Sequence, residues 1–128
     1  MTDEEVRAFL TRKSRLVLGT LGSDGAPCSD VTSCVYERDR LYALVPRDGD
    51  ALANLRRDPR VCCIVEEFPS YFEIKGVIVH ARASEASGEE RERAASRFPA
   101  GSGERFVVVR IPLERVVSFD FAKIQRRF

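Results

Sequence analysis

Cysteine and histidine, which often serve as nucleophile, general base and zinc ligand, are few in this sequence. The sequence contains four cysteines, at positions 28, 34, 62 and 63, and one histidine, His80. Zinc sites use sets of closely spaced Cys and His ligands, and the sequence has no Cys-x-x-Cys unit, so we expect no metal site. The cysteines are expected to be buried free thiols. Cys62 and Cys63 must point to opposite faces of a strand, one to the core and one to an interface.

The charged side chains do not indicate a nucleic acid or a membrane surface as partner. Lys and Arg number 21 and Asp and Glu number 20, whereas domains that bind nucleic acid usually carry a pronounced basic excess. No apolar run approaches the ~20 residues of a membrane-spanning helix, and residues 2–5 are acidic, unlike an export signal. We therefore expect a cytoplasmic protein with no nucleic-acid or membrane partner.

The order of the predicted elements favours one mainly β domain over residues 1–128. Thr2 and Glu5 form a capping-box pattern, which predicts a helix over about residues 3 to 13. A second helix is expected to be capped by Asp50 and to end near Asp58, and a third follows the Ser87 and Glu90 capping-box pattern. Strands are predicted at 15–21, 27–37, 41–45, 61–65, 71–83, 106–111 and 116–121.

Three local sequences follow the order of a known family. Residues 18–27 contain a Thr and an Asp-Gly-x-Pro turn, residues 54–61 join Asn-Leu to Asp-Pro-x-Val, and residues 77–83 read almost as Val-x-Val-x-Gly-x-Ala, with Ala81 in place of the Gly. Through these motifs, residues 5–121 resemble the pyridoxamine 5′-phosphate oxidase-like family of flavin-binding split barrels. The predicted fold is thus a six- to seven-stranded antiparallel split β-barrel with three short flanking helices.

The resemblance implies a homodimer with two FMN sites at the subunit interface and redox chemistry on a small-molecule substrate. In the family, the second strand and the end of the third line the flavin, and the following loop and helical turn hold its phosphate. One lysine position faces the flavin or a bound anion. The corresponding residues here are Val31, Thr32, Ser33, Cys34, Leu44, Val45, Arg47, Gly49, Asp50, Ala51 and Lys75.

The phosphate loop departs from the family pattern. The family has Ser, Arg or Lys where this chain reads Gly-Asp-Ala at residues 49–51. A carboxylate on Asp50 would compete with a phosphate for the free N–H groups of the helix N-terminus. Arg47, or Arg56 and Arg57 farther along the helix, would have to supply the missing cations.

Two other functions are compatible with the sequence. One is a split barrel that binds haem, with neutral His80 as the axial ligand, or a deazaflavin. The other is a dimeric binding or regulatory module without a cofactor, which the altered phosphate loop supports. A flavin performs hydride and electron transfer itself, so the lack of a catalytic motif fits both an enzyme and a non-enzyme.

Overall fold

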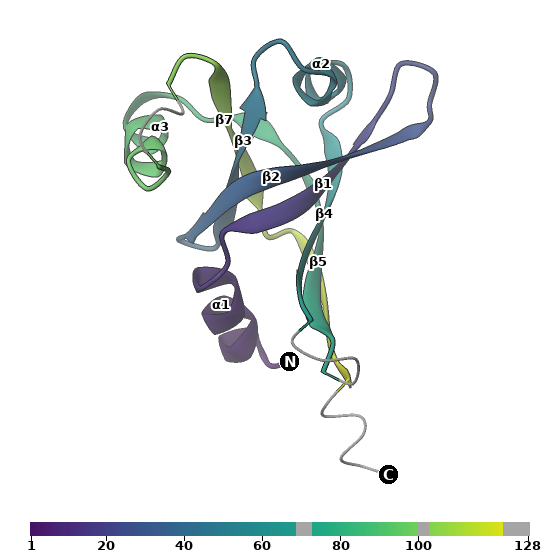
Figure 1. Cartoon of the computed structure of the whole chain (residues 1–128), viewed down its shortest axis with the longest axis vertical. Helices are drawn as coiled ribbons and strands as arrows, with labels where there is room; N and C mark the ends of the chain where they lie inside the picture. The colour runs from purple at the N-terminus through teal and green to yellow at the C-terminus, as the bar shows by residue number, and fades with distance from the viewer. Residues whose placement is uncertain (69–72, 100–102, 122–128) are drawn as a thin grey trace.

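The computed structural model describes residues 1–68, 73–99 and 103–121 (Figure 1). Its elements are α1 (Asp3–Thr11), β1 (Arg15–Leu21), β2 (Pro27–Glu37), β3 (Arg40–Pro46), α2 (Asp50–Arg57), β4 (Arg60–Glu67), β5 (Lys75–Arg82), β6 (Ser84–Glu85), α3 (Gly88–Ala95), β7 (Phe106–Pro112) and β8 (Arg115–Asp120). The strands form one antiparallel sheet in the order β6-β7-β3-β2-β1-β4-β5-β8. The predicted antiparallel split barrel with three helices is confirmed. The sheet has eight strands rather than six or seven, because the two-residue β6 is too short to produce a sequence pattern.

Two predicted boundaries shift in the structure. The strand expected over residues 71–83 begins at Lys75, and residues 71 and 72 lie outside the described residues. The first helix ends at Thr11 rather than at residue 13. Within the described ranges, no helix is both long enough and apolar enough to cross a membrane.

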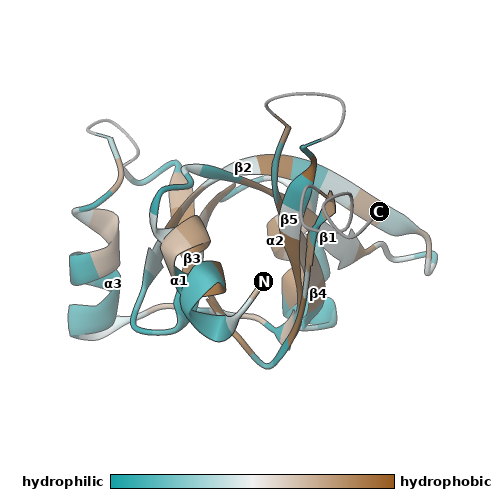
Figure 2. Ribbon diagram, turned by 90° about the horizontal axis from the view of Figure 1, so that it is seen from below, coloured by the Kyte–Doolittle hydropathy of each residue, from teal (hydrophilic) through white to brown (hydrophobic). Residues whose placement is uncertain are grey.

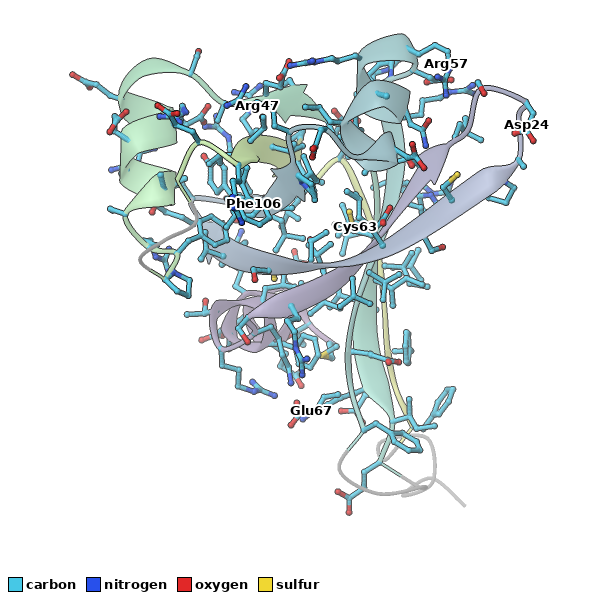
Figure 3. All side chains as sticks on the ribbon, turned by 45° about the horizontal axis from the view of Figure 1, so that its top comes forward. Asp24, Arg47, Arg57, Cys63, Glu67 and Phe106 are labelled. Atoms are coloured by element: carbon cyan, nitrogen blue, oxygen red, sulfur yellow. The ribbon has the colours of Figure 1, made fainter. Side chains whose placement is uncertain are left out.

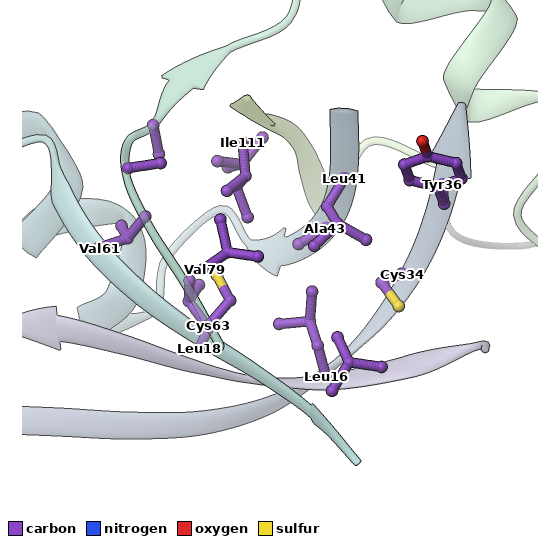
Figure 4. Packing of buried hydrophobic residues seen from close by; sticks show 14 of the residues in the cluster. Leu16, Leu18, Cys34, Tyr36, Leu41, Ala43, Val61, Cys63, Val79 and Ile111 are labelled. Atoms are coloured by element: carbon purple, nitrogen blue, oxygen red, sulfur yellow. The ribbon is translucent and has the colours of Figure 1, made fainter. Parts of the chain in front are cut away.

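The sheet curls around a hydrophobic core, and helices close its two ends. Inward-facing residues of β1 and β4, such as Leu18 and Cys63, are completely buried, and Figure 4 shows them converging from several strands. Phe9 of α1 and Leu52 of α2 join the same core. Figure 2, seen from the α1 end, shows α1 at the mouth of the curled sheet, while α2 lies at the opposite end in Figure 1. The core therefore holds α2 in a fixed place relative to the strands.

β3 is buried on both faces because α3 adds a smaller core outside the barrel. Val45 faces the main core, whereas Tyr42 and Leu44 pack with Ala94 and Phe98 beneath α3. A strand covered on both sides needs apolar residues at consecutive positions, as the sequence of β3 shows. The side chains of Leu44 and Val45, near the end of β3, therefore pack against other parts of the protein.

The two capping-box patterns differ in the structure. Thr2 Oγ1 accepts a hydrogen bond from the Glu5 N–H at 3.1 Å, and the Glu5 carboxylate accepts one from the Thr2 N–H at 3.2 Å. Ser87 occupies the N-cap position of α3, but its side chain makes no capping hydrogen bond. Glu90 instead accepts hydrogen bonds from Tyr42, at 2.9 Å, and from Arg40. A long-range contact thus replaces the second capping box.

We predict that Thr2→Ala lowers the free energy of unfolding by about 1 kcal/mol, the usual cost of losing an N-cap side chain. Ser87→Ala should change it by less than about 0.5 kcal/mol, because no capping bond is lost. Denaturant unfolding of both variants measures the difference. Equal losses in the two variants would contradict this assignment of the caps.

Candidate functional site

β2 and β3 pair along only part of their length, and the sheet opens where they diverge. Their pairing ends at Cys34 and Ala43. Beyond this point β2 follows β1 and β3 follows β7, so the two strands separate, as Figure 1 shows. Among the described residues, the facing edges of β2 and β3 have no strand partner there. We call this opening, bordered by residues 28–33 and 44–51, the split.

The split is bordered by the predicted flavin-contacting residues of β2, of β3 and of the start of α2. Lys75 does not join them. It begins β5, and its ammonium lies 4.0 Å from the carboxylate of Glu67. Figure 3 shows Glu67 at the far end of the molecule from Arg47, which lies in the loop before α2. Within one chain, Lys75 therefore does not contribute to the split.

The predicted site residues around the split differ in how much of their surface is exposed. Thr32 and Cys34 point into the barrel, with 7% and 3% of their surface exposed, whereas Val31 is 71% exposed on the outer face. Leu44 and Val45 are buried in the two cores. At the end of β3, a ligand would therefore meet backbone atoms rather than side chains.

The hydroxyl group of Thr32 has no hydrogen-bond partner although it is buried. A buried polar group without a partner costs about 1–3 kcal/mol, so such groups are rare unless something absent from the chain satisfies them. Thr32 lies on the part of β2 that borders the split. A ligand that reached this hydroxyl from the split would have to offer an acceptor such as a carbonyl or a ring nitrogen.

Buried polar contacts attach α2 to β1 beside the split. The Asn54 amide donates a hydrogen bond to the Thr20 hydroxyl at 3.0 Å, and both residues are at most 5% exposed. Arg57 donates to the Asn54 side-chain oxygen at 2.9 Å and to the Leu21 carbonyl at 2.7 Å. The Asn-Leu motif therefore has a structural role, since Asn54 positions the helix while Leu55 packs in the core.

The arginines proposed to hold a phosphate have protein partners. Arg47 donates its Nε–H to the Glu104 carbonyl at 2.8 Å. Arg56 pairs with Glu85 at 2.8 Å, and this hydrogen bond raises the pKa of Arg56. Arg57 is bound to Asn54 as described above. Each guanidinium is thus held toward a protein oxygen.

The N-terminus of α2 carries a negative rather than a positive side chain. Gly49, not Asp50, occupies the N-cap position, and Asp50 is the first residue of the helix. Ala51 is buried in the main core and offers no polar group. The expectation that Asp50 is the cap is therefore wrong by one residue, because Gly49 adopts the extended N-cap backbone.

An apolar row crosses the outer face of five strands. Strand register places Val31, Val17, Ile64, Ile78 and Val117 side by side on β2, β1, β4, β5 and β8. Val117 is 45% exposed, and the three central residues are half-buried. Solvent-exposed apolar patches of this kind mark interaction surfaces. The sequence predicted neither the row nor its extent, because each strand contributes only one of its residues.

A groove with a volume of about 420 Å³ adjoins the apolar row. Gly19 lies in its wall, where an added Cβ would come within 3.0 Å of the Cys62 carbonyl. Cys62 and the exposed His80 line the groove as neighbours on β4 and β5. Cys63 is fully buried, so the predicted opposite orientation of the two cysteines is confirmed.

All four cysteines are free thiols, and two of them are expected to be unreactive. Burial raises the pKa of Cys34 to about 11, and burial followed by the neighbouring thiols raises that of Cys63 to about 12. The thiolate is the reactive form. Alkylation of the native protein at pH 8, followed by peptide mass spectrometry, should therefore label half-buried Cys28 and Cys62 first. Labelling of Cys34 or Cys63 before unfolding would contradict their burial.

Comparison with known proteins relates the whole chain to one family. The family model of pyridoxamine 5′-phosphate oxidase matches residues 2–127. No curated protein sequence matches the chain.

Three solved structures illustrate the shared fold. A conserved hypothetical protein from Mycobacterium tuberculosis has a TM-score of 0.79 and 23% identity, over 98% of this chain and 88% of that one. An FAD-binding protein from Mesorhizobium loti has a TM-score of 0.75 and 24% identity, over 92% and 94% of the two chains. HutZ, the haem storage protein from Vibrio cholerae, has a TM-score of 0.73 and 20% identity, over 92% and 93%. At these identities the likeness shows the fold alone.

Proposed function

The chain belongs to the pyridoxamine 5′-phosphate oxidase family, and from this we propose that it is a homodimeric flavin-binding oxidoreductase acting on a small molecule. The observation that carries the proposal is the buried, unpartnered hydroxyl of Thr32 beside the split. The resemblance implies a flavin at this part of β2, which supports the proposal. An isoalloxazine ring carries carbonyl and nitrogen acceptors along one edge, which fits the Thr32 hydroxyl as a donor.

The contribution of the chain would be to bind and orient the ring. A bound flavin supplies hydride and electron transfer itself. Thr32 would hold the ring edge, and the unpaired backbone edges of β2 and β3 would offer further hydrogen bonds. Val31, which is largely exposed next to Thr32, would exclude water from the neighbouring face. FMN is the flavin that the resemblance implies, and its phosphate has no cationic partner at the start of α2.

We assign the apolar row to contact with a second copy of the chain. The row contains only Val and Ile. Two identical rows can therefore face each other without placing like charges together. A two-fold axis would place one row against the other and bury Val31 and Val117, the most exposed members. Val31 belongs to the stretch of β2 that borders the split, so the partner would lie next to the ligand site.

A haem protein is the alternative with support from a neighbour, because HutZ is a haem storage protein. His80 is exposed on the outer face beside Cys62, so a haem bound to it would have to lie in the groove. The Thr32 hydroxyl favours the flavin, since a haem ligand on the outer face would leave this buried group without a partner.

The absorbance spectrum of the purified protein, before and after incubation with flavins, tests the proposal. Absorbance bands near about 375 and 450 nm that remain after dialysis would support it. A Soret band would indicate haem, and a different long-wavelength band would indicate a deazaflavin. A colourless protein that binds no added flavin would disprove the proposal and leave a cofactor-free dimeric module.

A further inference from the structure

The end of the split nearest α2 is electrostatically unsuited to a phosphate group. Asp50 is exposed at the first position of α2, where its carboxylate provides the negative charge that a helix N-terminus favours. A phosphate at this end would compete with that carboxylate for the same N–H groups. The N-terminus of α2 therefore already carries a negative charge, which would repel the negative charge of a phosphate.

The surface pocket beside this loop does not supply a compensating positive charge. Arg47 and Arg105 line it together with Asp48 and Glu104. These two cations and two anions balance. Asp50 is then an additional negative charge at the adjoining helix end.

The geometry of Arg47 limits its use as a phosphate ligand. Its Nε–H donates to the Glu104 carbonyl, and its backbone N–H donates to the Arg105 carbonyl, each at 2.8 Å. Both bonds tie the loop before α2 to the segment that leads into β7 (Figure 3). A bidentate grip that uses the Nε–H together with one terminal N–H would therefore require the side chain to leave this position.

A flavin without a phosphate avoids the conflict. A phosphomonoester carries a charge of about −1.5 to −2 at neutral pH, whereas the terminal hydroxyl of a ribityl chain is neutral. Hydroxyl groups donate hydrogen bonds to carboxylates. Asp48 and Asp50 would therefore attract a polyol chain and repel a phosphorylated one.

We infer that this chain selects an unphosphorylated flavin, with riboflavin as the simplest example, over FMN. This inference rests on the proposed function, because it concerns the same split. It assigns Asp50 the role of excluding phosphate from the end of the site.

Fluorescence titrations of the flavin-free, full-length protein with riboflavin and with FMN test the inference. We expect riboflavin to bind at least tenfold more tightly than FMN at low ionic strength. The difference should shrink in high salt, because the repulsion is screened. Equal affinities, or tighter binding of FMN, would overturn the inference and leave the proposed function intact. If neither flavin binds, both fail.

Asp50→Arg provides the matched variant, and Asp3→Arg its control. Both aspartates are exposed and begin a helix, but Asp3 belongs to α1 at the other end of the barrel. Asp50→Arg should shift the riboflavin-to-FMN affinity ratio at least tenfold toward FMN, while Asp3→Arg leaves the ratio unchanged. Asp50→Asn should shift the ratio in the same direction by a smaller factor. A ratio unchanged in Asp50→Arg and Asp50→Asn, or shifted equally by Asp3→Arg, would overturn the role of Asp50.

Discussion

Val117→Glu is expected to convert the proposed dimer into a monomer and to abolish flavin binding with it. Val117 ends the apolar row on β8 and is already 45% exposed in the single chain, so a glutamate there does not disturb the fold. In a two-fold contact the substitution introduces two carboxylates into an apolar interface. Leaving a charge buried without a partner costs about 2–5 kcal/mol or more, which corresponds to at least about thirtyfold weaker association. Sedimentation velocity and flavin titration measure the two effects.

Val116→Glu is the control for this experiment. Val116 precedes Val117 on the same strand and is 39% exposed, but it pairs with Val79 and points to the opposite face. There it lines a pocket with Met1 and Val6 of the N-terminal segment. The same charge on the same strand should leave the dimer intact. A dimer that survives Val117→Glu, or that is lost in both variants, would contradict the assignment of the apolar row.

Asn54→Ala is expected to lower the free energy of unfolding by about 2–4 kcal/mol, from a lost buried hydrogen bond and a small cavity. The substitution leaves the buried Thr20 hydroxyl without its donor and removes one of the two acceptors of Arg57. α2 would lose its polar attachment to β1. Denaturant unfolding monitored by circular dichroism measures the loss.

A double-mutant cycle with Thr20→Val separates the hydrogen bond from the cavity. If the Asn54 to Thr20 bond accounts for much of the loss, the double variant should be more stable than the sum of the single effects predicts, by at least about 0.5 kcal/mol. Strictly additive losses would mean that the bond contributes little, and that Asn54 acts through packing alone.

The elements of the fold could be predicted because their signals are local. The capping box of α1 and the turn at residues 22–25 involve residues a few positions apart, and the structure places a helix and a hairpin there. Ser87 and Glu90 show the limit of such signals. Their spacing correctly placed the start of α3, but Glu90 turned to Tyr42 and Arg40, which lie far away in the sequence.

Which residues bind a ligand stays a prediction. The resemblance named segments of β2, β3 and α2, and these segments border the split in the structure. It did not show that Leu44 and Val45 are buried in two separate cores or that Thr32 lacks a partner. Nor did it show that Lys75 is remote from the split within one chain.

The amino-acid sequence by itself determined which segments become strands and helices, because periodicity, turns and caps act over a few residues. It also determined the negative charge at the start of α2, since Asp50 is present whatever surrounds it. Only the tertiary structure decided where β2 and β3 part and which residues form the apolar row. Both depend on strand register, in which a shift of one residue moves every side chain to the other face.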